Sequence, residues 1–586
     1  MSALNRQRQL AIRHAAERWL EQDPDAATRA ELAGLLERAG EPTAVDADIL
    51  PDTPGDAAAA WRELDDRFSL RLAFGTAGLR GRQGAGPNRM NRVLVAQAAR
   101  GFAEFLLARA ERTGEAPSIV IGYDARINSD VYARDTAELM QAAGVRATLL
   151  PRLLPTPVLA FAVRRLRASA GVMVTASHNP KWDNGYKVYL GGEDGGSQIV
   201  APADAEIAAC IQRVASEELV HELPRSDAYS IAPESLVDEY AAATAAVFRG
   251  EVRPLTVAYT PMHGVGWETF AKVLERIGIP EPVLVEEQLA PDGSFPTVDF
   301  PNPEEPGALD LAFAAADRAD ADLVIAHDPD ADRLAVALRN REGAWERLGG
   351  NDIGKLLGWR AAEGLALTGG DLRSATLATS LVSSPALSKV AAEYGCGYAE
   401  TPTGFKWISR APGIVFGYEE ALGYLVNPES VHDKDGISAS VAIVEMAMSL
   451  AAQGRTLRDL DDEFSERFGS YASVQESVRF ERVADIPAVM AALRAALPAE
   501  IGGVSVRTAE DLAAGAGGQP PADIVRIWLE DGTRVMVRPS GTEPKIKCYV
   551  DAVGEEGSAD ERRAAASAMA ARAAGDMAAR LRALTG

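Results

Sequence analysis

Three stretches of the sequence repeat one alternation of short apolar strands and helices, and this repeat constrains the fold more than any other feature. The copies cover residues 118–189, 255–338 and 374–426. Strands that are apolar throughout are buried on both faces, and their alternation with helices is typical of largely parallel sheets covered by helices. The pattern therefore predicts an α/β protein with three related mixed α/β domains.

The end of the chain differs from the repeat. Residues 523–553 predict a hairpin at Asp531-Gly532 and a strand after Pro544, and an alanine-rich helix follows from Asp560 to Leu584. This pattern is typical of a smaller α+β domain. A chain of 586 residues divides into about four domains at ~150 residues each. We expect the domain bounds to be residues 1–222, 223–342, 343–470 and 471–586.

Each copy of the repeat carries a loop of reactive side chains directly after one of its strands. Ligands of open α/β sheets bind at the carboxyl ends of the strands. We therefore expect the three loops to line one central cleft. The residues in question are Ser177 and His178 in the first copy, Asp328, Asp330 and Asp332 in the second, and Glu419 and Glu420 in the third.

The loop TASHNP places Ser177 just after a short strand, residues 170–174. The turn-forming pairs Asn179-Pro180 and Asn184-Gly185 hold the serine on a sharp loop, where its hydroxyl is available as a nucleophile. The alternative is a loop in which Ser177 and His178 only shape a turn. We assign that shaping role to His178.

The loop HDPDADR carries carboxylates at alternate positions. We expect an extended loop that aims Asp328, Asp330 and Asp332 at one point, which suits a hard divalent cation with oxygen ligands. An EF-hand does not fit, because the positions that need glycine and glutamate are Arg333 and Arg339. A solvated acidic turn is the remaining alternative.

The segment RPSGTEPKIK is basic in a chain that has 84 acidic and 60 basic residues and a net charge of −24. Arginine offers paired donors that match a phosphate, and glycine lets the backbone approach an anion closely. An ordinary turn between strands is the alternative. The predicted phosphate-binding residues are Arg538, Ser540, Gly541, Thr542 and Lys545.

Other segments add polar groups to the predicted cleft. The glycine-rich segment 74–91 predicts a mobile loop that brings Arg80 and Arg82 to an anion. The carboxylates of GYEEALGY suit hydrogen bonds to sugar hydroxyls, and TPTGFKW and KDG each add a lysine. The candidate substrate-binding residues from these segments are Thr403, Gly404, Lys406, Glu419 and Lys434.

Composition excludes several classes of protein. The negative charge argues against nucleic-acid and membrane-surface partners. The cysteines, Cys210, Cys396 and Cys548, are widely spaced, so neither a disulfide framework nor a CxxC metal site is indicated. The N-terminus indicates an amphipathic helix and not a signal peptide, and no apolar run reaches ~18 residues. We expect a soluble, cytoplasmic monomer or homodimer.

The segment GGNDIGKL nearly matches a nucleotide-binding loop, but Leu356 stands where that loop needs a hydroxyl. A serine hydrolase is disfavoured because GxSxG is absent around Ser177.

Five segments occur along nearly the whole chain in one order: GTAGLRG, TASHNP, DPDADR, GYEEALG and RPSGTEPK. With them the chain resembles the α-D-phosphohexomutase superfamily, most closely its phosphoglucomutase/phosphomannomutase branch, which includes phosphopentomutase-like enzymes. The resemblance implies four domains around a central cleft and a Ser177 that carries a phosphoryl group. It implies Mg²⁺ at Asp328, Asp330, Asp332 and the Ser177 phosphate, with Arg333 adjacent, a sugar loop at Glu419 and a phosphate loop at 538–545.

The resemblance also implies a reaction. Phosphate would move between C1 and C6 of a sugar, glucose first and mannose second, through a sugar 1,6-bisphosphate that also serves as activator. Arg80 and Lys187 are candidates for stabilising the transferring group, and Lys187 alternatively handles the hydroxyl proton. The waiting phosphoenzyme must exclude water, so we expect domain closure with the fourth domain as the mover.

Two departures from the family pattern put the sugar preference in doubt. The sugar loop has Ala421 where many members have serine, and Tyr424 where some bacterial members have histidine. The alternatives are a phosphopentomutase that exchanges the 1- and 5-phosphates, a sugar 1,6-bisphosphate synthase, and a non-catalytic phosphosugar-binding protein.

Overall fold

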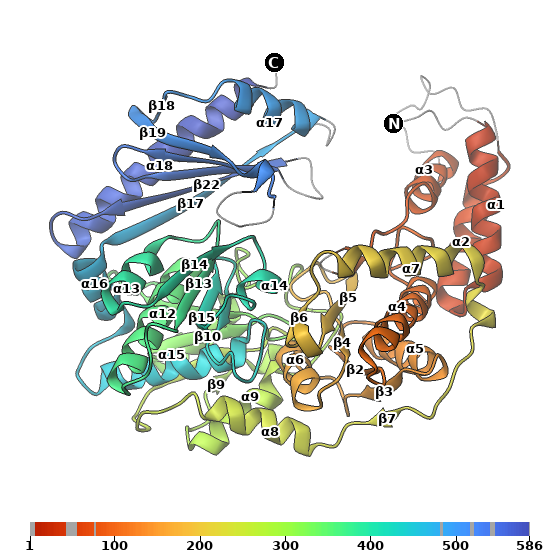
Figure 1. Ribbon diagram of the computed structural model, residues 1–586, viewed down its shortest axis with the longest axis horizontal. Helices are drawn as coiled ribbons and strands as arrows, with labels where there is room; N and C mark the ends of the chain where they lie inside the picture. The colour runs from red at the N-terminus through yellow and green to blue at the C-terminus, as the bar shows by residue number, and fades with distance from the viewer. Residues whose placement is uncertain are drawn as a thin grey trace. The chain divides into compact units, whose positions relative to one another are not determined.

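The computed structural model describes residues 6–42, 56–75, 78–480, 485–515, 521–539 and 545–584. The chain forms two compact units, and Figure 1 labels many of their helices and strands. The first comprises Met1–Ala246, Thr256–Trp345 and Glu429–Ile437, and the second comprises Val247–Leu255, Glu346–Pro428 and Ser438–Gly586. The domain bounds expected from the sequence stay a prediction.

The first sheet of the first unit has the strand order β1-β5-β4-β2-β3-β7, with β6 beside β5. Its strands β2, β3, β4 and β7 are parallel, whereas β5 runs antiparallel to both β4 and β1. The strands are β1 (Leu79–Arg82), β2 (Ser118–Tyr123), β3 (Arg146–Leu149), β4 (Ala170–Val174), β5 (Asp183–Leu190), β6 (Ser197–Gln198) and β7 (Ser230–Ile231).

Helices connect and cover this sheet. Because β3 and β4 lie on either side of β2, right-handed crossovers put α5 and α6 on opposite faces of the sheet. The carboxyl ends of β2 and β4 therefore meet at a topological switch point, where open α/β sheets bind ligands. The helices of this part are α4 (Arg92–Thr113), α5 (Ser129–Ala142), α6 (Thr156–Arg165), α7 (Ala203–Glu217) and α8 (Ser235–Ala245).

Three helices precede the first sheet: α1 (Arg6–Gln22), α2 (Ala26–Ala39) and α3 (Asp56–Phe68). They contribute Trp19, Leu32 and Trp61 to the same apolar core that the sheet fills. The helix expected at the N-terminus is thereby confirmed, and it is an integral part of the first unit.

The second sheet of the first unit has the order β12-β11-β10-β8-β9. The strand expected at PVLVEEQ is wrong in part, because it ends at Leu284 and Glu286–Leu289 is helical. The strands are β8 (Val257–Thr260), β9 (Val283–Leu284), β10 (Leu323–His327), β11 (Leu334–Arg339) and β12 (Trp345–Arg347), within which the chain passes into the second unit. The helices are α9 (Gly266–Ile277), α10 (Glu286–Leu289) and α11 (Asp310–Ala319).

The second unit begins with a sheet of order β14-β13-β15-β16. Its strands are β13 (Thr376–Ser380), β14 (Gly397–Thr401), β15 (Ile414–Glu419) and β16 (Gly423–Leu425). The neighbouring helices are α12 (Gly350–Leu367), α13 (Ala386–Tyr394), α14 (Phe405–Ile408), α15 (Gly436–Ala451) and α16 (Leu457–Phe468).

The last sheet is antiparallel, with the order β17-β22-β21-β20-β19-β18. The hairpin expected at Asp531-Gly532 joins β20 to β21, and Gly532 takes the left-handed conformation, φ 84°. A capping box of Ser558 and Glu561 starts α18, which packs on β17 and β22. The elements are β17 (Ser470–Arg479), α17 (Ile486–Ala495), β18 (Glu500–Ile501), β19 (Val504–Asp511), β20 (Val525–Leu529), β21 (Arg534–Pro539), β22 (Lys545–Gly554) and α18 (Ala559–Ala583).

The three α/β sheets share one topology, which confirms the repeat and the predicted fold class. In each, the first strand lies between the second and the third, and an antiparallel strand follows the third. The first strands are β2, β8 and β13, and the third strands are β4, β10 and β15. The switch point of each copy therefore lies between its first and third strands. The reactive loops predicted from the sequence follow the third strands.

Candidate functional site

Ser177 lies on a strained turn just after β4. Its φ is 49°, in the left-handed region that non-glycine residues rarely adopt, and the residue is 2% exposed. The side chain of Thr175 accepts a hydrogen bond from the Ser177 amide at 2.8 Å. The Ser177 hydroxyl donates to Oδ2 of Asp328 at 2.7 Å, so the loops of the first and second copies meet inside the first unit.

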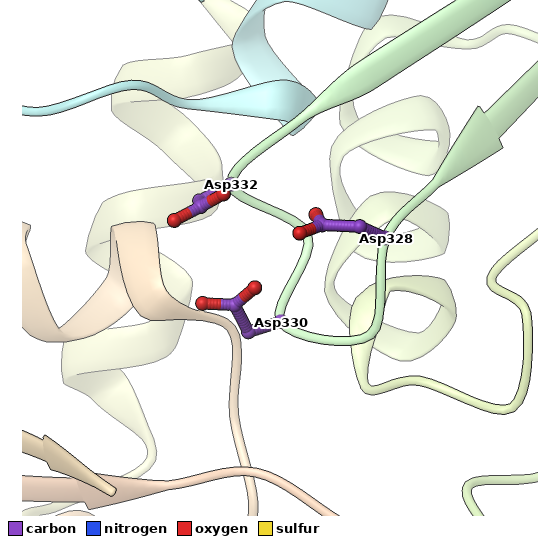
Figure 2. A group of neighbouring side chains, drawn as sticks. All are labelled: Asp328, Asp330 and Asp332. Carbon is purple, nitrogen blue, oxygen red and sulfur yellow. The ribbon is translucent and has the colours of Figure 1, made fainter. Parts of the chain in front are cut away.

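The three aspartates lie on the loop between β10 and β11, with their carboxylates directed toward one another (Figure 2). One ligand oxygen from each lies within 4.8 Å of the others, and all three residues are buried. The expectation of an extended loop is wrong. Ala331 has φ 53° and its amide donates to the Asp328 carbonyl at 2.8 Å, so a tight turn brings the carboxylates together.

Basic side chains surround the triad. Lys187, on β5, reaches Oδ2 of Asp330 at 2.6 Å and Oδ2 of Asp332 at 2.7 Å. Lys434 lies 3.0 Å from the same oxygen of Asp332. Burial opposes ionisation of Asp332, but these two ammonium groups outweigh it and hold the pKa of Asp332 below its usual value. The cluster therefore has its own counterions.

The donor set of the triad fits a hard divalent cation. Oδ1 of Asp330 and Oδ1 of Asp332 are buried and accept no hydrogen bond, although Arg333 Nε lies 3.8 Å from the latter. Burial and the charges of the other two aspartates raise the pKa of Asp328 well above its usual value. Buried carboxylate oxygens without donors are costly, and a cation with all-oxygen ligands satisfies them. Such a ligand set suits Mg²⁺.

The loop after β8 packs against the loop between β10 and β11, which we call the metal loop because its carboxylates fit a divalent cation. The amide of Val265 donates to the carbonyl of Pro329 at 2.9 Å. A Cβ on Gly264 would lie 2.4–2.7 Å from backbone atoms of Pro329, so only glycine fits there. Met262 and His263 take positive φ values of 49° and 60°. The switch point of the second copy is thus closely packed on the carboxylate loop.

Residues 429–437 cross back into the first unit and hold the metal loop from another side. Tyr189 donates to Asp433 at 2.7 Å and Tyr240 to Asp435 at 2.9 Å. His327 Nε2 lies 3.2 Å from the Gly436 carbonyl. Burial lowers the pKa of His327 to about 3, so its ring is neutral. The segment places Lys434 at Asp332, and the substrate-binding role expected for Lys434 stays a prediction.

Arg80 and His178 lie beside the Ser177 loop. The expectation of a mobile loop at Arg80 and Arg82 is wrong, because both lie on β1, which pairs with β5. Arg80 donates to Oδ1 of Asn179 at 3.0 Å. His178 Nδ1 is 3.2 Å from the Ser177 hydroxyl, and desolvation with the charges of Arg333 and Arg80 holds the pKa of His178 well below its usual range.

Three supporting residues of this region were missed by the sequence reasoning. Asp124 and Arg126 follow β2, and Thr156 starts α6 and donates to Oδ2 of Asp330 at 2.5 Å. The signal that points to Asp124 and Arg126 is their place at the carboxyl end of the first strand of the copy, next to Ser177.

The predicted sugar loop lies in the second unit. Glu419 ends β15 and is 8% exposed. The carboxylate of Glu420 accepts hydrogen bonds from Ser380 at 3.1 Å and Ser383 at 2.9 Å, and the Ser383 hydroxyl accepts one from the Glu420 amide at 3.0 Å. The loop after β13, the first strand of this copy, therefore holds the loop after β15, the third strand.

The predicted phosphate-binding residues also belong to the second unit. Arg538 donates to the Thr403 hydroxyl at 2.7 Å, Lys406 lies on α14, and Lys545 begins β22. Gly404 has φ 108°, which only glycine adopts readily. Ser540, Gly541 and Thr542 lie outside the described residues.

The near-match to a nucleotide-binding loop has a structural explanation. Lys355 is buried on α12, where it lies 2.9 Å from Asp352 and 2.7 Å from Asp461. The carboxylates of Asp352 and Asp461 thus neutralise the charge of Lys355 within the second unit.

Comparison with known proteins divides the chain into the same four parts. The chain matches the family models described as phosphoglucomutase/phosphomannomutase alpha/beta/alpha domain I at residues 71–218, domain II at 238–343, domain III at 350–468 and C-terminal domain at 476–568. These matches and the four-domain α/β architecture define the class, an enzyme that transfers phosphate within a sugar. The chain belongs to the phosphoglucomutase/phosphomannomutase family.

Individual relatives cover most of the chain. It is 52% identical over 467 residues to the probable phosphomannomutase of Haemophilus influenzae, across 80% of this chain and 94% of that protein. It is 33% identical over 550 residues to the phosphopentomutase of Homo sapiens, across 85% and 87%. A solved phosphoglucomutase/phosphomannomutase family protein from Burkholderia thailandensis has the same fold, with a TM-score of 0.66 at 20% identity across 88% and 98%. Within the described residues, no helix is both long and apolar enough to span a bilayer.

Proposed function

We propose that the chain is a phosphosugar mutase whose phosphoryl carrier is Ser177. The observation that carries this proposal is the 2.7 Å contact between the Ser177 hydroxyl and Asp328, beside carboxylate oxygens of Asp330 and Asp332 that accept no hydrogen bond. A nucleophile next to a divalent-cation site is the arrangement that phosphoryl transfer needs. Asp328, Asp330 and Asp332 would hold Mg²⁺, which neutralises charge on the transferring group when bound.

The transfer balances without a further reactant. As an oxygen of the sugar hydroxyl bonds to the phosphorus of phospho-Ser177, the bond from phosphorus to Ser177 Oγ breaks. The hydroxyl proton ends on Ser177 Oγ, and the product is a sugar bisphosphate. Reversal with the other phosphate restores phospho-Ser177 and gives the isomeric monophosphate. Arg80 and Lys187 contribute positive charge next to this step, and a supplied sugar bisphosphate primes the unphosphorylated enzyme.

The second unit supplies substrate recognition in this proposal. Arg538, Ser540, Gly541, Thr542 and Lys545 bind the phosphate that does not react, and Thr403, whose hydroxyl accepts a hydrogen bond from Arg538, contributes with Gly404 and Lys406 of the same unit. Glu419 binds sugar hydroxyls. Turnover then requires the bisphosphate to exchange its two ends, and domain closure with the C-terminal domain as the mover excludes water meanwhile.

The sugar is a hexose in our proposal, because the relative of 52% identity bears the name probable phosphomannomutase. The phosphopentomutase at 33% identity makes a pentose the second candidate. Coupled assays of glucose 1-phosphate, mannose 1-phosphate and ribose 1-phosphate, run side by side, rank the three. Net bisphosphate formation from a glycolytic acyl phosphate would instead indicate a bisphosphate synthase.

Ser177→Ala tests the carrier. We expect wild-type protein to gain the mass of one phosphoryl group on incubation with glucose 1,6-bisphosphate, and Ser177→Ala to gain none and to lose turnover. Ser169→Ala is the matched control, because Ser169 precedes β4 at the end opposite to Ser177, and its hydroxyl accepts a hydrogen bond from the Ser118 amide at 3.1 Å. An alanine variant at 177 with full turnover would disprove the proposal.

A further inference from the structure

One guanidinium group holds the backbone of the Ser177 loop. Nη2 of Arg126 donates to the carbonyls of Ser177 and Asn179, each at 2.6 Å. Nη1 donates to the carbonyls of Pro180 and Asp183, each at 2.9 Å. The Arg126 side chain is fully buried. A single side chain therefore satisfies carbonyls along the whole turn that carries the nucleophile.

All the terminal N–H donors of Arg126 are used by the Ser177 loop. A guanidinium has five N–H groups, and the four on Nη1 and Nη2 are all directed at loop carbonyls. The fifth, on Nε, makes no hydrogen bond and lies 3.7 Å from Oδ2 of Asp124. Arg126 thus has no terminal N–H left for a phosphoryl group, so any influence on the reaction passes through the loop.

The hold explains how the strained turn persists. A left-handed non-glycine residue survives only where its surroundings over-determine it. Here the Ser177 carbonyl is fixed by Arg126, and its amide by Thr175, whose hydroxyl in turn donates to Asp124 at 2.6 Å. With amide and carbonyl both fixed, the side chain of Ser177 is left to point at Asp328.

The turn that carries Arg126 is itself packed against the second α/β domain of the same unit. The Phe295 ring lies with its centroid 5.1 Å from the Arg126 guanidinium carbon. A Cβ on Gly293 would lie 2.5 Å from the Ala125 carbonyl oxygen and 2.7 Å from the Ile127 amide. The guanidinium is therefore locked on one side by the Ser177 loop and on the other by residues 293–295.

From this geometry we infer that Arg126 is the positioning residue of the nucleophile: it sets the direction of the Ser177 hydroxyl without touching the phosphoryl group. The inference rests on the proposed role of Ser177. It predicts a defect in the transfer step itself. Substrate binding by the second unit is untouched.

Chemical rescue tests the inference. In Arg126→Ala we expect kcat to fall about 100-fold, the effect of misplacing a reacting group by about 1 Å. KM should stay within about threefold, because ground-state binding is unchanged. Millimolar guanidinium chloride, far below the molar range that unfolds proteins, should refill the buried site and recover kcat. Intact-mass measurement of phosphate uptake by Ser177 should show the same loss and recovery.

Arg92→Ala is the matched control. Arg92 likewise makes paired hydrogen bonds in the first unit, donating twice to Asp135 at 2.7 Å, but its side chain is partly exposed and these bonds involve no residue of the site. We expect it to lower thermal stability, to keep kcat, and to show no response to guanidinium. Equal kcat losses in the two variants, or equal responses to guanidinium, would overturn the inference.

Arg126→Lys keeps the test decisive if the alanine variant does not fold. Lysine keeps the charge but presents one nitrogen, which cannot reach four carbonyls. We expect a folded protein with reduced kcat and slow phosphate uptake, and wild-type kcat would overturn the inference. The two proposals fail differently. Wild-type protein that takes up no phosphate on Ser177 refutes the carrier, whereas wild-type rates of uptake in both Arg126 variants refute only the positioning role.

Discussion

The loops after β10 and β15 occupy equivalent places in two copies of one sheet topology, and both carry acidic residues. In the first unit, Asp330 and Asp332 each leave one buried oxygen that accepts no hydrogen bond. In the second unit, Oε2 of Glu420 accepts hydrogen bonds from both Ser380 and Ser383, and neither oxygen of Glu420 is a buried atom without a partner. The loop after the third strand thus carries buried carboxylate oxygens without donors in one copy, and no such oxygen on Glu420 in the other.

This difference separates a ligand site from a structural contact better than residue type does. Buried polar atoms without partners are rare in folded proteins because they cost free energy, so a cluster of them indicates a partner that binds there. A carboxylate that neighbouring hydroxyls already satisfy indicates a fixed loop. The open oxygens of Asp330 and Asp332 therefore fit a bound cation, and the hydroxyls of Ser380 and Ser383 hold Glu420 in the framework of its loop.

The largest expected effect comes from removing one open carboxylate. A ligand that binds only the folded protein stabilises it, and Mg²⁺ at 100 times its dissociation constant would contribute about 2.7 kcal/mol. Asp330→Asn should lose most of this stabilisation, because a neutral amide is a poorer ligand for a hard cation. Calorimetry with and without Mg²⁺ measures the difference.

Glu420→Gln serves as the control for that experiment and should keep the full Mg²⁺ response. If Asp330→Asn responds to Mg²⁺ as strongly as the wild type does, the buried oxygens without donors do not mark the cation site. The difference between the two loops then says nothing about where a ligand binds.

A smaller effect is expected from Gly264→Ala. The added Cβ would meet the Pro329 backbone at 2.4–2.7 Å, so the metal loop must shift. Overpacking of this kind costs about 1–3 kcal/mol, and the shift should also weaken Mg²⁺ binding, which calorimetric titration measures. Gly364→Ala is the control, since nothing lies within 4 Å of a Cβ there. Unchanged Mg²⁺ affinity in Gly264→Ala would show that the loop after β8 does not position the carboxylates.

Much of this arrangement could be predicted from the sequence. The apolar run 170–174 ends in a reactive serine, and the run before Asp328 ends in three carboxylates. Strand ends of this kind meet ligands in any open α/β sheet. Reactive residues that follow equivalent strands of a repeat can therefore be assigned to one kind of site from the sequence alone.

The rest depends on contacts that sequence spacing does not encode. Arg126 holds carbonyls of residues 177–183, which are distant in sequence, and backbone carbonyls leave no residue-type signal. Lys434 reaches Asp332 only because residues 429–437 return to the first unit. The turn at Ala331 was missed because alternating aspartates look the same in an extended loop and in a left-handed turn.

The smallest expected effect is that of Glu420→Gln on the second unit itself. Glutamine keeps an acceptor for the two serine hydroxyls but loses the charge. A hydrogen bond to a charged group contributes about 1 kcal/mol more than one between neutral groups, so we expect a loss of about 1 kcal/mol in stability by calorimetry. KM for the preferred sugar phosphate should change less than about threefold, because we assign the Glu420 carboxylate to holding its loop and not to binding the substrate.

Variants of two neighbouring residues separate the effect on stability from the effect on substrate binding. Ser383→Ala removes a donor to the Glu420 carboxylate and the acceptor of its amide, so it should reproduce the stability loss with the same small change in KM. Glu419→Gln alters the residue to which we assign sugar binding, and it should raise KM instead. A large rise in KM for Glu420→Gln at unchanged stability would mean that a satisfied carboxylate still exchanges its serine partners for the sugar. The hydrogen bonds that a carboxylate accepts from its own loop would then fail to distinguish a framework residue from a sugar-binding residue in this copy.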